Sequence, residues 1–191
     1  MSDGLRTPAD VSRQAEPGRA ARRPDQFRTL RVGIGEFAVS NDEEEMLTTF
    51  ALGSCVAVCL WEPSARVGGM LHFMLPDSAL NGDRARLAPG SFADTGIALM
   101  FRAAYELGAQ KTRCIVRLVG GAEMSAPVSP PVEGMFNVGK RNILAARGVL
   151  WRNGIMIRGE AVGGNSPRTV TLAVADGQIT VKADGRVVSD L

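Results

Sequence analysis

One stretch of the chain restricts its fold more than any other, the run MLTTFALGSCVAVCLWEP at positions 46–63. The run is dense in apolar and β-branched residues, which favour buried strands. Only Gly53-Ser54 punctuates it, and a glycine followed by a small polar residue is typical of a tight turn. The run therefore predicts two buried strand pieces joined by a turn at Gly53-Ser54.

The rest of the chain alternates strand signals with loops and two helical patterns. Apolar or alternating runs predict further strands at 30–40, 67–76, 114–121, 154–162, 168–174 and 179–183, with Asp176-Gly177 as the hairpin turn between the last two. Loops are predicted at 41–45, 77–92 and 125–136. Apolar residues at helical spacing predict helices at 94–107 and 138–150.

Because strands come before, between and after the two helices, the order favours an α+β protein over a repeated βαβ unit. We therefore predict a β-sandwich of mixed sheets with flanking helices. Residues 1–28 are rich in Arg, Pro, Ala and Asp and hold few large apolar side chains. Such a segment cannot bury enough surface to offset its ordering entropy, so we predict a disordered N-terminal tail at 1–28 and a single domain at 29–191.

Charge and cysteine content exclude several classes of protein. The formal net charge of +2 comes from the predicted tail, and the remainder of the chain is balanced, so the basic footprint of a nucleic-acid binder is missing. No apolar run approaches the ~20 residues that span a bilayer, which predicts no membrane insertion. Three cysteines cannot form a full set of disulfides, and free thiols favour the cytoplasm.

The cysteines do not suit a metal site. Cys55 and Cys59 lie four residues apart in a predicted strand, which separates them by ~13 Å. One zinc ion, with thiolates at ~2.3 Å, cannot bind both. Cys114 lies in a separate apolar run. We therefore predict neither a metal nor any other cofactor.

Cys55 is instead the best-placed candidate nucleophile. It follows Leu-Gly-Ser at the start of a predicted strand, a position that can expose its side chain to a cleft. The turn residues Gly53 and Ser54 can leave backbone N–H groups free to bind a developing oxyanion. Cys59 and Cys114 have no comparable turn beside them and are predicted to be small buried hydrophobic residues.

His72 is the only histidine in the chain and so the only imidazole that could activate the thiol. Residue content alone favours a hydrogen-bonded core histidine, since His72 lies in the apolar strand GGMLHFMLP. A base also needs a third group to fix its tautomer. Thr48, Thr49, Ser54 and Glu62 are all candidates, and their spacing does not choose among them.

These residues together resemble a known family. The T-x5-C spacing at 49–55, the run LGSCVAVCLWEP and the following GGMLHFMLP resemble the CheD family of chemoreceptor glutamine deamidases. The likeness extends over residues 30–185 and includes LGA (107–109), VGGAEM (119–124), VGKRN (138–142) and GGNSPR (163–168). The chain departs from the family pattern at Arg117-Leu118-Val119 and in the proline-rich loop 125–135.

The resemblance implies that Cys55 is the nucleophile, His72 the general base and acid, and Thr49 the residue that orients the histidine. It implies a sandwich similar to the catalytic domain of the cytotoxic necrotizing factor toxins. It also implies methyl-accepting chemotaxis receptors as protein substrates and a CheC-type phosphatase as a partner. Two alternatives stay open: regulation of that phosphatase by binding alone, and transfer of the acyl group to an amine instead of water.

Overall fold

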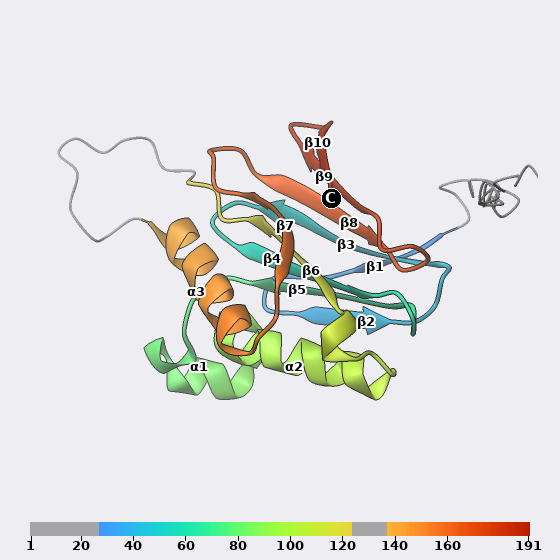
Figure 1. Ribbon diagram of the computed structural model, residues 1–191. Helices are drawn as coiled ribbons and strands as arrows, with labels where there is room; N and C mark the ends of the chain where they lie inside the picture. Colours follow the sequence, from blue (N-terminus) through green and yellow to red (C-terminus); the bar gives the residue numbers. More distant parts are fainter. Residues whose placement is uncertain (1–26, 124–136) are drawn as a thin grey trace, which may run out of the picture.

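The computed structural model describes residues 27–123 and 137–191 and arranges them in three layers (Figure 1). Two five-stranded sheets face each other, and helices cover the outer side of one of them. The first sheet has the strand order β1 (Arg28–Arg31), β3 (Glu45–Leu52), β8 (Arg168–Ala173), β9 (Ile179–Ala183) and β10 (Arg186–Asp190). The second has the order β2 (Phe37–Ser40), β5 (Val67–Phe73), β4 (Val56–Glu62), β6 (Ile115–Gly120) and β7 (Ile157–Val162).

Each sheet is mixed, because β1–β3 and β6–β7 are parallel pairs and the other pairs are antiparallel. Helices α2 (Ala93–Glu106) and α3 (Val138–Arg152) lie on the second sheet, close to the predicted ranges. The predicted α+β sandwich with mixed sheets and flanking helices is confirmed at this level.

Strand β4 is apolar along most of its length because both of its faces are buried. Val56, Val58 and Leu60 pack against the helices, whereas Ala57 and Cys59 pack between the two sheets. Side chains alternate across a strand, so a strand in the middle layer buries both of its faces. Strands β4 and β5 are accordingly buried along almost their whole length.

The single strand predicted at 30–40 is wrong. The chain forms β1 in the first sheet, crosses over, and enters β2 in the second sheet. Gly35 makes the crossing possible, with φ at 80° and a backbone so close to Ser91 that a Cβ would lie 2.6 Å from its Oγ. Its N–H donates to the carbonyl of His72 at 2.7 Å, which ties this crossing to β5.

Two further predictions need correction. The predicted loop 77–92 contains the 3₁₀ turns Ser78–Leu80 and Pro89–Ser91 and the short helix α1 (Gly82–Leu87). The chain also closes with one strand more than predicted, because β10 pairs with β9 after a turn at Asp184-Gly185. The sequence signal for β10 is weak because this edge strand is mostly exposed.

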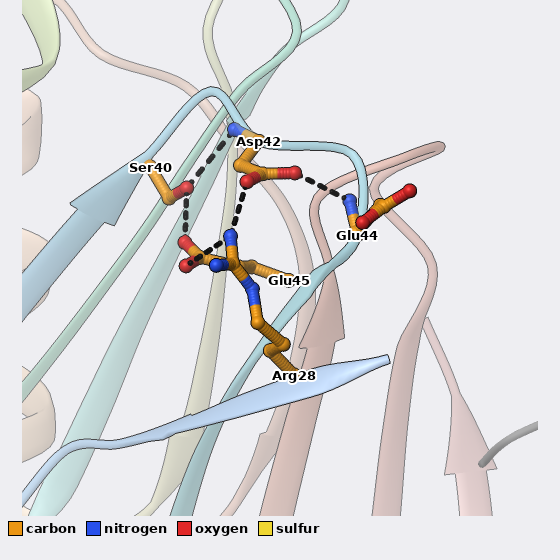
Figure 2. Close-up of polar contacts among 5 residues, drawn as sticks. All are labelled: Arg28, Ser40, Asp42, Glu44 and Glu45. Atoms are coloured by element: carbon orange, nitrogen blue, oxygen red, sulfur yellow. Dashed lines mark hydrogen bonds and ion pairs between the residues drawn. The ribbon is translucent and has the colours of Figure 1, made fainter. Parts of the chain in front are cut away.

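The predicted tail and one predicted loop fall largely outside the described ranges, in residues 1–26 and 124–136. Arg28, which the sequence placed in the tail, is the first residue of β1. Its guanidinium forms ion pairs with Asp42 and Glu45, and Ser40 Oγ donates to Glu45 at 2.5 Å (Figure 2). This network holds the acidic turn between β2 and β3 against the start of β1.

Candidate active site

The predicted turn at Gly53-Ser54 joins two different sheets. Strand β3 of the first sheet ends at Leu52, and β4 of the second sheet begins at Val56. Residues 53–55 therefore form a corner at one end of the sandwich, and Cys55 is the last residue of that corner. Its side chain is partly exposed, as a nucleophile that must reach a substrate requires.

Thr49 and His72 meet beneath this corner, although they come from different sheets. Thr49 Oγ1 lies 2.7 Å from His72 Nδ1 and also 2.7 Å from the carbonyl oxygen of Val32, and both side chains are buried. A carbonyl can only accept, so the single hydroxyl proton of Thr49 goes to Val32. The hydroxyl must then accept a hydrogen bond from Nδ1–H of His72.

This arrangement fixes the tautomer of the imidazole. With its proton on Nδ1, His72 presents an unprotonated Nε2, and this nitrogen has no hydrogen-bond partner in the part of the chain that the structure describes. Burial lowers the pKa of His72 from its ordinary value of 6.5 to about 4, against a smaller opposing effect of the Val32 carbonyl. At neutral pH the ring is therefore a neutral base with a free lone pair.

Strand register places Cys55 on the same face of the second sheet as His72. In the antiparallel pair of β4 and β5, Ala57 lies opposite His72. Cys55 precedes Ala57 by two residues, so it is on the same face and diagonal to His72, a spacing that side chains can bridge. The structure therefore joins Thr49 to His72 by a hydrogen bond and places Cys55 diagonal to His72.

Burial also raises the pKa of the Cys55 thiol. The thiol and the imidazole are therefore both neutral at rest, and no hydrogen bond joins them among the described residues. Burial raises the pKa of Cys59 to about 12 and that of Cys114 to about 11, so neither can act as a thiolate. Cys59 is fully buried as predicted, whereas Cys114 is only half-buried.

The backbone of the corner is held by hydrogen bonds to neighbouring segments. The carbonyl of Cys55 accepts from Gly121 N–H at 2.7 Å, and the carbonyl of Gly53 accepts from Ala122 N–H at 2.8 Å. Gly53 N–H donates to the carbonyl of Ala51 at 2.8 Å. Of the two predicted oxyanion-binding residues, only Ser54 therefore has an N–H without a partner among the described residues.

Sequence reasoning missed Asn142 of α3, which is fully buried beside the corner. Its Nδ2 donates to the carbonyl of Ser54 at 3.0 Å and to that of Met74 at 2.9 Å. A buried asparagine on the apolar face of a predicted helix was the available signal. The role of Val32 had no side-chain signal at all, because it acts through its carbonyl.

Three buried side-chain atoms in the described ranges lack a hydrogen-bond partner, and all belong to this end of the sandwich: His72 Nε2, Asn142 Oδ1 and Arg168 Nη1. Arg168 lies opposite Leu52, at the end of β3 where the corner begins. Unsatisfied buried groups are rare in proteins, and a cluster of them marks a place where strain, a catalytic role or a bound water or ion has to explain them.

The chain is similar in sequence to proteins of one known family. A family model described as CheD chemotactic sensory transduction matches residues 74–183. A probable chemoreceptor glutamine deamidase CheD 1 of Syntrophus aciditrophicus is 46% identical over 160 residues, covering 84% of this chain and 97% of that protein. Probable chemoreceptor glutamine deamidases CheD of Solibacter usitatus and Thermococcus kodakarensis are 42% and 37% identical, covering 81% and 83% of this chain and 89% and 96% of their own length.

Among solved structures, the Bacillus licheniformis hypothetical protein YfiH matches with a TM-score of 0.43 at 12% identity, covering 76% of this chain and 62% of that chain. This likeness is too low to carry an argument about fold or function. None of the helices in the described ranges is long and apolar enough to cross a membrane. The family model and the relatives, which match most of the chain, establish that the protein belongs to the CheD family.

Proposed function

We propose that this chain is a protein-glutamine glutaminase that converts glutamines of methyl-accepting chemotaxis receptors to glutamates. Membership of a family whose relatives are named probable chemoreceptor glutamine deamidases supports the substrate. The observation that carries the mechanism is the hydrogen bond between Thr49 and His72, because it leaves Nε2 unprotonated on the same strand face as Cys55.

The reaction then runs in two stages. His72 Nε2 removes the thiol proton of Cys55 while the sulfur attacks the carboxamide carbon, and the carbonyl electron pair moves onto the oxygen. The oxyanion accepts from the N–H groups of Ser54 and Cys55. When it collapses, the carbon–nitrogen bond breaks, the imidazolium gives its proton to the departing ammonia, and a thioester of Cys55 remains.

Water completes the turnover. His72 Nε2 takes a proton from the water that attacks the thioester, and the carbon–sulfur bond breaks to release the glutamate side chain. The proton returns to the Cys55 sulfur, so the enzyme is regenerated. Because burial keeps the thiol and the imidazole neutral at rest, proton transfer accompanies the attack and no thiolate needs to persist in the free enzyme.

Each turnover adds one negative charge to the receptor. On a helix, such a charge changes the repulsion between neighbouring acidic side chains and so the stability of signalling conformations. We place this reaction in the cytoplasm, which the three free thiols favour. We also propose that a CheC-type phosphatase binds the protein, which pull-down with the catalytically inactive Cys55→Ala variant tests separately from catalysis.

The proposal extends to the fold, which we infer to be that of the cytotoxic necrotizing factor catalytic domain. The mixed sandwich with a cysteine at a sheet-to-sheet corner and a histidine on the next strand supports it. Superposition of the two proteins tests this inference. A superposition that aligns the sheets but separates the two cysteine–histidine pairs would contradict it.

The activity is tested by incubating the protein with receptor fragments and measuring ammonia release together with glutamine-to-glutamate conversion by mass spectrometry. Cys55→Ser should abolish both signals. Cys114→Ser is the matched control, because Cys114 is also half-buried and its thiol donates only to the carbonyl of Gln110, which a serine can replace. Conversion that persists in Cys55→Ser, or that is lost in Cys114→Ser, would refute the assignment.

A further inference from the structure

Asn142 connects the two segments that carry the candidate nucleophile and base. One of its hydrogen bonds goes to the carbonyl of Ser54, the residue before Cys55. The other goes to the carbonyl of Met74, two residues after His72. A single buried amide thus joins the backbone on both sides of the proposed reacting pair.

The strand ladder does not hold these two segments together at this point. The last residue pair of β4 with β5 is Val56 with Phe73, and beyond it the two chains diverge. Met74 N–H donates instead to the carbonyl of Ser91, and the carbonyls of Gly53 and Cys55 accept from Ala122 and Gly121. Asn142 bridges the gap where ladder hydrogen bonds have stopped.

The orientation of the amide is fixed by its partners. Both acceptors are carbonyl oxygens, so both must be met by the N–H₂ group, and the amide cannot be flipped. The Oδ1 atom is then left buried without a partner among the described residues. A buried unpaired acceptor opposes stability, so the side chain is poorly explained as a contribution to the core of α3.

We propose that Asn142 is a positioning residue that sets the separation between Cys55 Sγ and His72 Nε2. This inference rests on the proposed function and adds a residue to it. Among the described residues, Asn142 forms no hydrogen bond with the thiol or the imidazole, and it acts by holding the backbone of Ser54 and Met74. Its removal takes away the hydrogen bonds that join these two segments to each other, and small misplacements of reacting groups cost large factors in rate.

The decisive variant is Asn142→Leu, which keeps the size of the side chain and removes both donors. We expect kcat on a receptor fragment to fall by about 100-fold with KM changed by less than about threefold, since Asn142 is fully buried and both of its hydrogen bonds go to backbone carbonyls of this chain. The matched control is Asn153→Leu. Asn153 lies at the other end of α3 and its Nδ2 also donates to a backbone carbonyl, that of Val149 at 2.8 Å, far along the helix from Cys55. Asn153→Leu should keep wild-type kcat.

A second measurement does not need turnover. Alkylation of Cys55 by iodoacetamide at pH 7 should slow by at least about tenfold in Asn142→Leu, because assistance by a positioned base is lost. Alkylation of Cys55 in Asn153→Leu under the same conditions is the reference and should keep the wild-type rate. If wild-type protein makes no glutamate, the proposed function fails, and the alkylation rates still test the positioning role.

Three results would overturn the inference. The first is a kcat for Asn142→Leu within threefold of that for Asn153→Leu. The second is alkylation of Cys55 that is unchanged or faster. The third is a failure of both Asn142→Leu and Asn142→Asp to fold. Aspartate has the shape of asparagine without the amide donors, so this result would show that Asn142 is required for the fold itself.

Discussion

The buried neutral state of His72 has a consequence for stability that can be measured. Because the pKa of His72 is about 4 in the folded protein and about 6.5 when the chain is unfolded, the unfolded state binds a proton first as the pH falls. The contribution is fully present above pH 6.5, declines as the pH falls below it, and levels off near pH 4. Between pH 7 and pH 4.5, linkage gives a loss of roughly 2 kcal/mol in the free energy of unfolding.

Carboxylates also titrate in this range, so a single protein does not isolate the effect. His72→Asn removes the titrating ring and keeps an amide N–H that can reach Thr49, and the carboxylates are the same in both proteins. The free energy of unfolding of each is measured by urea denaturation at pH 7 and pH 4.5. His72 is the only histidine, so the wild type should lose roughly 2 kcal/mol more than the variant. An equal loss in both proteins would refute a buried, neutral His72.

Two other substitutions test the geometry of the site. Thr49→Val should lower kcat by about tenfold or more and the free energy of unfolding by about 1–3 kcal/mol, because it leaves Nδ1–H of His72 without an acceptor. Thr49→Ser keeps the hydroxyl and should have most of the wild-type rate. Equal rates for the two variants would contradict this role of Thr49. Gly120→Ala should abolish activity and cost more than about 2 kcal/mol in thermal or urea unfolding, since its Cβ would lie 2.4 Å from the carbonyl oxygen of Cys55 at a φ of 110°. Gly163→Ala, at a φ of 76° in open space, should show only a backbone cost of about 1–2 kcal/mol and keep activity.

Several parts of the site were predictable from the sequence because they depend on local patterns. The turn at Gly53-Ser54 is marked by its glycine, and the apolar run at 67–76 predicts the buried strand β5, in which Met70 and Leu71 pack on opposite faces of the second sheet. The candidate nucleophile and the candidate base stood out because one thiol follows a turn and the chain has a single histidine. The choice of Thr49 came from resemblance to the CheD family.

Other features depend on contacts between distant segments, which no local pattern records. The crossing at Gly35 is decided by its close approach to Ser91 and by its bond to the carbonyl of His72. Asn142 acts on two carbonyls that are 88 and 68 residues away along the chain. The sequence reads as one strand at 30–40 because apolar residues continue through the crossing, and only packing shows that they enter two sheets.

The sequence by itself determined that the chain has buried strands around a turn at Gly53-Ser54, two amphipathic helices, one thiol beside that turn and one imidazole. These follow from side-chain hydrophobicity and glycine conformations, which are properties of single residues and their neighbours. Only the tertiary structure decided that the turn joins two sheets, and that the hydroxyl of Thr49 donates to Val32 and so fixes the proton on Nδ1 of His72. The protonation state of the base is decided by hydrogen bonds and burial across the sandwich, because these interactions arise only when segments distant in sequence pack together.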